Sequence, residues 1–185
     1  ALAVVGSNAT LPRCSGLPDN AFETDGVMTK RPVRALTMSA LAPHPGEMLW
    51  DIGGGSGSIA IEWLLADPTC QALTIEPRAD RLALITSNAA ALGVDRLQVV
   101  EGSAPDALHD LPKPDAIFIG GGLSDDMITT LETVAPGTRV VANGVTLEAE
   151  ALLARLHAKK GGELMRIDIA RSKPLGRKRG WDAAY

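Results

Sequence analysis

Aromatic residues and positive charge are both in short supply in this chain of 185 residues. Phe, Trp and Tyr make up 3% of the sequence, and the formal net charge is -4 at pH 7. Few aromatic rings are therefore available to stack on bases, and a basic face of the kind that binds nucleic acid is not expected. We expect no nucleic-acid partner.

The chain also lacks long apolar runs and has few cysteines. No stretch reaches the roughly 20 apolar residues that a membrane-spanning helix needs, and the opening residues ALAVVGSNAT lack the basic start of a secretory signal. Cys14 and Cys70 stand far apart, with no CxxC pair and no histidine at metal-ligand spacing. These features predict a cytoplasmic protein with no membrane partner and no metal site.

What is present is typical of a globular domain with a sizeable core, since 45% of the residues are apolar and 22% are charged. Residues 1–28 are rich in Gly, Pro, Asn and Ser, which predicts an irregular lead-in. Residues 29–185 predict a single domain. The sequence starts at Ala1 without a methionine, so we interpret it as part of a longer polypeptide.

From Thr29 onward, apolar runs of strand length alternate with longer helical patterns. A first helix is expected from Thr29, which can cap it, to just before Pro43, with Pro32 in the first turn. Strongly apolar strands separated by helices indicate an α/β, doubly wound, mostly parallel sheet with helices on both faces. Strands are predicted at 47–52, 71–76, 97–102, 116–121 and 138–145, helices at 58–66, 78–92, 124–134 and 147–160, and a further antiparallel strand at 162–172.

The stretch DIGGGSGS, residues 51–58, joins the first predicted strand to a helix through a glycine turn. Such turns hold a nucleoside triphosphate, a dinucleotide or S-adenosylmethionine against backbone groups. A phosphate loop requires a lysine after its last glycine, and Ser58 stands there instead. The dinucleotide fingerprint GxGxxG would place its third glycine at the same serine, which weakens that match.

The remaining pattern is GxGxG, preceded by Asp51 inside the end of the strand. Glycines allow a ligand to approach the backbone closely, and a carboxylate suits a cationic ligand better than a pyrophosphate. S-adenosylmethionine carries a sulfonium and an ammonium group. We therefore expect this cofactor to bind the turn formed by Gly53, Gly54, Gly55, Ser56 and Gly57.

The loops after the next strands are expected to complete the site. Glu76 ends the second predicted strand, where an acidic residue accepts hydrogen bonds from ribose hydroxyls. The third strand leads into EGSAPDAL, where Ser103, Ala104 or Asp106 can meet an adenine edge. The fourth is followed by GGGLSDD and not by an Asn-Pro-Pro-aromatic clamp for a flipped base, which argues against nucleic-acid methylation.

Few other residues suggest a role. Asn143, at the end of the fifth predicted strand, is a candidate substrate contact facing the same crevice. The segment RSKPLGRKRG, residues 171–180, concentrates positive charge and is either a solvated tail or a site for a polyanionic ligand. No catalytic base is evident, because the three histidines, His44, His109 and His157, lie away from the predicted strand ends and are expected at the surface.

Several stretches together carry a more specific signal over about residues 16–145. They are GLPDNAFETDGVMTKRPVRAL, LWDIGGGSGSIAIEW, IEP, NAAALGV, EGSAPDAL and DAIFIGGG. In this combination the chain resembles the decarboxylating precorrin C15-methyltransferase family of cobalamin biosynthesis. That family occurs as a stand-alone subunit or as the carboxyl-terminal domain of precorrin-6Y C5,15-methyltransferase.

The resemblance implies a Rossmann-like class I methyltransferase that uses S-adenosylmethionine, with cofactor contacts at Thr29, residues 53–57, Glu76 and Ala104. It implies methylation of C15 of a precorrin and decarboxylation of its C12 acetate side chain. It also implies a fused amino-terminal C5-methyltransferase domain and a homo-oligomer, as a tetramer. The many carboxylates of such a substrate give Arg177 and Arg179 a role, because arginine pairs with carboxylates bidentately.

Three alternatives stay open at this point: a class I methyltransferase of another small molecule, an NAD-dependent oxidoreductase, and a cofactor-binding module without catalysis.

Overall fold

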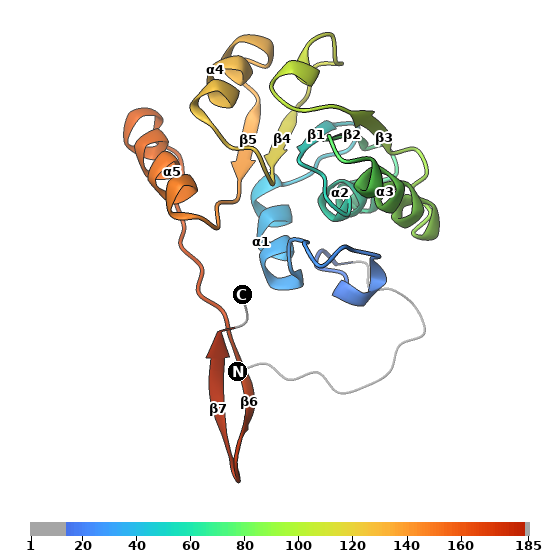
Figure 1. The fold of residues 1–185 in the computed structure, drawn as a ribbon. Coiled ribbons are helices and arrows are strands. Elements are labelled where there is room, and N and C mark those ends of the chain that lie inside the picture. The colour runs from blue at the N-terminus through green and yellow to red at the C-terminus, as the bar shows by residue number, and fades with distance from the viewer. Residues whose placement is uncertain (1–13, 184–185) are drawn as a thin grey trace. The chain divides into compact units, whose positions relative to one another are not determined.

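Five apolar segments of the chain form one parallel sheet (Figure 1). The computed structural model describes residues 14–183, and contacts divide the chain into a first unit that ends at Thr146 and a second that begins at Leu147. All five predicted strands are confirmed, with ends that shift by at most three residues. They are β1 (Met48–Ile52), β2 (Gln71–Glu76), β3 (Gln98–Glu101), β4 (Ala116–Ile119) and β5 (Arg139–Ala142).

The order of the strands in the sheet reverses at β1. The order is β3-β2-β1-β4-β5, so the chain moves outward from β1 in one direction and then returns to build β4 and β5 on the other side. Each neighbouring pair is parallel. In such sheets, ligands bind outside the carboxyl ends of the strands next to the reversal. The topology therefore places a binding crevice beyond the ends of β1 and β4.

The helices of the first unit cover both faces of this sheet. Leu49 of β1 packs in one apolar cluster with side chains of α1, α2 and α3. Trp50 and Ile52 of the same strand point to the other face, where they pack with Met127 and Leu131 of α4. This alternation is the period of two expected of a strand. The bounds are α1 (Arg31–Leu41), α2 (Ser58–Ala66), α3 (Ala79–Ala91) and α4 (Asp125–Val134), with short 3-10 turns η1 (Asp19–Ala21) and η2 (Asp106–Leu108).

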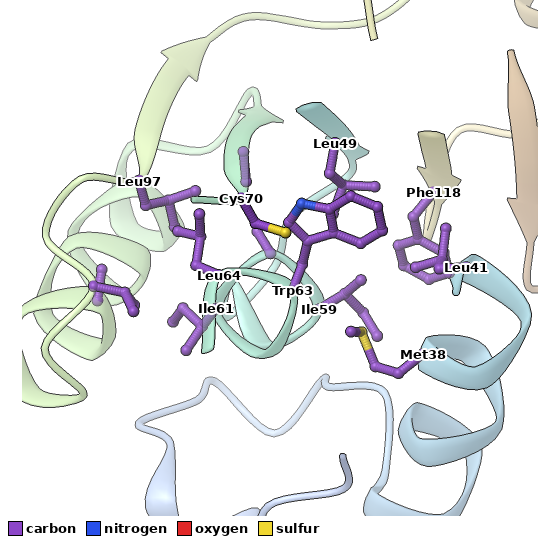
Figure 2. Packing of buried hydrophobic residues seen from close by; sticks show 14 of the residues in the cluster. Met38, Leu41, Leu49, Ile59, Ile61, Trp63, Leu64, Cys70, Leu97 and Phe118 are labelled. Carbon is purple, nitrogen blue, oxygen red and sulfur yellow. The ribbon is translucent and has the colours of Figure 1, made fainter. Parts of the chain in front are cut away.

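Trp63 of α2 lies at the centre of the first cluster (Figure 2). Its ring is fully buried among Leu49, Cys70 and Phe118, and its Nε1 donates a hydrogen bond to the Gln71 carbonyl at 2.9 Å. A large aromatic side chain fills much of the core, and because its single polar atom is hydrogen-bonded, its burial leaves no unsatisfied donor. This packing fixes α2, and with it the turn that precedes the helix, against the sheet.

The first helix begins later than the sequence predicts. α1 starts at Arg31 with Lys30 as its N-cap, so Thr29 lies outside it and does not cap it. Pro32 stands in the first turn as expected, where its missing N–H costs no hydrogen bond. Because Thr29 is outside the helix, its carbonyl is available to a side chain, and Arg34 Nη1 donates to it at 2.5 Å.

The second unit contains α5 (Leu147–Lys160) and a two-stranded hairpin of β6 (Ala170–Leu175) and β7 (Lys178–Ala183). The predicted strand at 162–172 is therefore wrong over most of its length. Its alternation is strand-like, but a strand needs a paired neighbour, and within the described chain residues 162–169 have none. The basic segment is not a plain tail either, since Gly176, with φ +59°, makes the tight turn of the hairpin.

Among the helices of residues 14–183, none combines the length and the hydropathy that a bilayer crossing requires.

Candidate functional site

A pocket of about 330 Å³ lies in the first unit at the carboxyl ends of the strands. Three of its walls are the glycine loop (residues 53–57), the end of β2 and the loop after β4. A further wall comes from residues 27–29, which belong to a segment that we call the strap (residues 23–29). The crevice that the topology implies is thus closed on one side by the lead-in.

Nearly all the predicted cofactor residues line this pocket. They are Thr29, Gly53, Gly54, Gly55, Ser56, Glu76, Ser103 and Ala104. Gly57 was predicted with them but is absent from the described lining. Its φ of +75° turns the chain into α2, and a Cβ there would meet Ile85 Cγ2 at 3.1 Å. We conclude that Gly57 shapes the turn and packs on α3.

Close approach of neighbouring segments explains Gly53 and Gly54. A Cβ on Gly53 would lie 2.9 Å from the backbone nitrogen of Gly121, so the loops after β1 and β4 touch each other. A Cβ on Gly54 would lie 2.0 Å from Thr74 Oγ1 of β2. Side chains at either place would force the walls of the pocket apart.

Asp51 is a buried acidic residue of the site with one carboxyl oxygen that is not hydrogen-bonded in the described structure. It lies on β1 beside the pocket, is 1% exposed, and its Oδ2 accepts a hydrogen bond from the Ala60 backbone at 3.3 Å. Its Oδ1 has no hydrogen-bond partner among the described residues. Burial, with a smaller contribution from the charge of Glu76, raises the pKa of Asp51 to about 7. A buried carboxyl with a free oxygen is costly unless a ligand satisfies it.

Glu76 is buried too, but both of its oxygens are engaged. Oε2 accepts from the Gly55 backbone at 3.0 Å, and Oε1 accepts from the Arg78 backbone at 3.2 Å. The carboxylate thereby holds the glycine loop against β2. Each carboxylate oxygen can accept a second hydrogen bond, so Glu76 keeps acceptor capacity for ligand hydroxyls.

The strap is held at the surface by ion pairs. Asp25 Oδ2 lies 2.9 Å from Arg81 Nη2 and 3.5 Å from Arg78 Nη1, and both arginines line the pocket. Backbone and arginine hydrogen bonds lower the pKa of Asp25. No local sequence pattern indicates these contacts, since Asp25 and Arg81 are far apart in the chain.

The lead-in is also tied down by a buried ion pair. Glu62 of α2 accepts hydrogen bonds from Arg34 Nε at 2.5 Å and from the backbones of Gly16 and Leu17 at 2.6 and 2.9 Å. Arg34 is fully buried and also donates to the carbonyls of Leu17 and Thr29. This pair was not predicted from the sequence either, although both residues stand inside the motifs that carry the family resemblance.

The remaining candidates lie elsewhere. Asn143 donates from Nδ2 to Thr37 Oγ1 of α1 at 3.0 Å, and it is absent from the described pocket lining. The three histidines are exposed, as expected. Asp106 starts η2 and does not line the pocket in the described structure. Within residues 14–183, no group of His, Cys, Asp and Glu side chains is arranged to hold a metal ion.

A family model described as a precorrin methyltransferase domain matches residues 20–185. The chain belongs to this family. A precorrin-6Y C(5,15)-methyltransferase (decarboxylating) of Sinorhizobium sp is 59% identical over 176 residues, covering 94% of this chain and 43% of that protein. A probable cobalt-precorrin-6B C(15)-methyltransferase (decarboxylating) of Pyrobaculum calidifontis is 35% identical, covering 88% of this chain and 87% of that protein.

The fold of the precorrin methyltransferase family is also found in solved structures. The C-terminal domain of precorrin-6Y C5,15-methyltransferase from Rhodobacter capsulatus has a TM-score of 0.88 at 57% identity, covering 93% of this chain and 94% of that one. A SAM-dependent O-methyltransferase from Thermotoga maritima shares the fold, with a TM-score of 0.64 at 17% identity. The resemblance and the Rossmann-like class I fold predicted from the sequence are both confirmed. The chain spans less than half the length of the precorrin-6Y relatives that it matches.

Proposed function

We propose that this chain binds S-adenosylmethionine in the pocket of the first unit, methylates C15 of a precorrin and decarboxylates its C12 acetate side chain, in cobalamin biosynthesis. Family membership and the names of the relatives support this reaction. The observation that carries the choice of cofactor is Asp51, whose buried Oδ1 has no partner among the described residues beside the glycine loop.

A cationic ligand satisfies that oxygen better than an anionic one. Two buried carboxylates, Asp51 and Glu76, belong to the lining, and a pyrophosphate beside them would be repelled. The ammonium or sulfonium of S-adenosylmethionine is attracted instead and favours the ionised form of Asp51. Arg78 and Arg81 also line the pocket, but Asp25 lies against both of them. The electrostatics thus favour S-adenosylmethionine over a nicotinamide dinucleotide.

The other lining residues contact different parts of the cofactor. Glu76 accepts from the ribose hydroxyls, and Ser103 and Ala104 meet the adenine edge. The glycine loop (residues 53–57) and Thr29 hold the remaining part of the cofactor by their backbones. All of these residues except Gly57 line the pocket. Gly57 packs against Ile85 of α3 and so helps to fix the shape of the loop.

S-adenosylmethionine supplies the methyl group when bound. The chain's contribution is to hold the acceptor carbon in line with it at contact distance, since positioning alone supplies much of the acceleration of such a transfer. In the decarboxylation, loss of carbon dioxide from the acetate leaves an electron pair that the conjugated macrocycle accepts. A proton then completes the methyl group.

We propose that the second unit contacts the precorrin and further copies of the chain. Arg177 and Arg179, on and beside β7, pair with carboxylates of the precorrin. Leu175 and Trp181 of the hairpin are 65% and 78% exposed, and an isolated hairpin is marginally stable in water. We infer that the hairpin pairs with further copies of the chain, in a tetramer. The longer relatives support a fused amino-terminal C5-methyltransferase domain. We also propose that the enzyme is cytoplasmic.

The decisive assay incubates the chain with C5-methylated or unmethylated precorrin and S-adenosylmethionine labelled in its methyl group. We expect transfer of the label together with release of carbon dioxide. Cofactor binding without either product would favour a binding module. Label transfer only to other small molecules would favour a class I methyltransferase of different specificity, and a preference for NAD would favour an oxidoreductase.

A further inference from the structure

Asn88 of α3 is a buried polar residue to which the proposed function gives no role, although it is the first residue of the motif NAAALGV. It is 2% exposed and does not line the pocket in the described structure. Its side-chain amide nevertheless makes three hydrogen bonds, all to backbone groups of two other segments. One segment is the glycine loop, which lines the pocket, and the other is the strap, whose residues 27–29 line it.

Two of the bonds hold the strap. Asn88 Oδ1 accepts from the Glu23 backbone N–H at 2.7 Å, and Nδ2 donates to the Glu23 carbonyl at 2.8 Å. The amide therefore pairs with both backbone groups of one residue, as a neighbouring strand would. A carboxamide does this because it offers a donor and an acceptor side by side. Glu23 begins the strap, whose residues 27–29 line the pocket.

The third bond holds the glycine loop. Asn88 Nδ2 also donates to the Ser56 carbonyl at 2.9 Å, and this contact is buried. One side chain thus joins the strap to the glycine loop across α3. Glu76, at the end of β2, holds the same loop through Gly55 from another side. The loop is therefore held between two buried polar side chains that lie on neighbouring elements.

The other bonds between the strap and α3 are exposed and correspondingly weaker. Ser87 Oγ donates to Glu23 Oε2 at 3.1 Å, and the Asp25 pair with Arg81 lies nearer the surface. Exposed ion pairs contribute little because water competes for them. Buried hydrogen bonds are costly to lose, since each orphaned partner stays out of water. Asn88 is therefore the buried contact through which α3 holds both the strap and the glycine loop.

We propose that Asn88 is a positioning residue for the cofactor, which holds the strap and the glycine loop at the separation that S-adenosylmethionine requires. It acts through Glu23 and Ser56 and does not touch the reacting atoms. The inference rests on the proposed function, since it takes S-adenosylmethionine as the occupant of the pocket. It follows that Asn88 affects cofactor affinity much more than turnover.

The test compares Asn88→Ala with a variant of similar structural cost. Arg96 is the matched control, because its side chain also makes three hydrogen bonds to backbone carbonyls, those of Leu64, Asp67 and Cys70, and does not line the described pocket. We expect Asn88→Ala to raise the Kd for S-adenosylmethionine, measured by calorimetry, about tenfold. The kcat at saturating cofactor stays within about twofold of wild type. Arg96→Met lowers the Tm but leaves the Kd unchanged.

A second variant and a second measurement guard against a trivial result. Asn88→Asp keeps the shape and the acceptor but loses both donors, so its Kd rises at least as much. Hydrogen exchange of the cofactor-free variants reports the same contacts without any ligand, and we expect faster exchange in residues 23–29 and 53–57 for both Asn88 variants only.

An unchanged Kd for Asn88→Ala, an equal rise for Arg96→Met, or unaltered exchange in the two segments would overturn the inference. If the wild type itself binds no S-adenosylmethionine, the proposed function fails, and the exchange pattern alone still decides whether Asn88 joins the walls.

Discussion

The pocket end of the first unit and the hairpin of the second unit hold their charges in opposite ways. Arg34, Asp51 and Glu76 are buried, and each makes hydrogen bonds to backbone groups of neighbouring elements. The charges of the hairpin are exposed, as the pair of Lys173 with Asp182 illustrates, with both side chains 54% exposed. Fixed, desolvated charges suit recognition of one cofactor, and exposed, solvated charges suit attraction of a polyanionic substrate.

The largest effect should come from the buried ion pair of the first unit. Arg34→Met leaves Glu62 charged and unpaired in the core, so we expect the free energy of unfolding to fall by about 3–5 kcal/mol. Lys173→Met breaks the exposed pair of the hairpin and should cost about 1 kcal/mol or less. Urea denaturation of both variants checks this. Equal losses would remove the distinction between the two regions.

Loss of Glu76 should come next, as an effect on cofactor binding. Glu76→Ala removes the acceptor for the ribose and also frees the Gly55 N–H, so we expect the Kd for S-adenosylmethionine to rise about 100-fold, as for two or more lost bonds to a charged group. Glu76→Gln keeps one acceptor oxygen, so its Kd for S-adenosylmethionine should lie between those of the wild type and Glu76→Ala. Calorimetry measures both. A Kd within twofold of wild type for Glu76→Ala would show that the ribose is bound elsewhere.

The pH dependence of cofactor binding sharpens the comparison further. Because the pKa of Asp51 is raised to about 7 in the empty pocket, the carboxylate that attracts a cation is mostly protonated below that pH. We expect affinity to rise about tenfold between pH 6 and pH 8, following the ionised fraction. Asp51→Asn should abolish this rise. A pH-independent Kd for the wild type would contradict the role of Asp51.

The same shift has an opposite effect on the stability of the empty protein. The folded state holds the Asp51 proton more tightly than the unfolded chain, whose pKa is near 3.8. The contribution of this group to the free energy of unfolding is therefore greatest at low pH and is lost as the pH rises from about 4 to about 7. Asp51→Asn should raise the Tm of the empty protein at pH 8 relative to wild type. A lower Tm at that pH would mean that the Asp51 carboxylate has a stabilising partner there.

The smallest effect belongs to the hairpin. Replacing Arg177 and Arg179 by Ala should raise the KM for the precorrin several-fold, because exposed charges contribute modestly to binding. Cofactor affinity should stay nearly unchanged, since neither residue belongs to the described pocket lining. Steady-state kinetics, with the precorrin and S-adenosylmethionine varied in turn, separate an effect on precorrin binding from an effect on cofactor binding. Equal losses for precorrin and cofactor would contradict the division of labour between the regions.

The sheet and most of the pocket could be predicted because their signals are local. The strands are short apolar runs, and the glycine loop joins one of them to a helix, so periodicity and spacing were enough. The topology of a parallel sheet then brings Glu76, Ser103 and Ala104 to the same edge. Thr29 was a prediction of the family resemblance, and it lies in the lining because the strap folds over the pocket.

The remainder depends on contacts between residues far apart in the chain. Arg34 with Glu62, Asp25 with Arg81 and Asn88 with Glu23 are pairs that no local pattern indicates. The strand predicted at 162–172 failed for a related reason, since alternation describes a strand but does not supply its neighbour. The turn at Gly176 was the signal that could have indicated the hairpin.

The most direct test of the account is the affinity of the wild-type chain for S-adenosylmethionine and for NAD, measured by calorimetry at pH 8 beside Asp51→Asn. We expect binding of S-adenosylmethionine, none of NAD at comparable concentration, and a weaker affinity for S-adenosylmethionine in the variant. Tighter binding of NAD, or an unchanged affinity in Asp51→Asn, would contradict the claim that a buried carboxylate selects a cationic cofactor here.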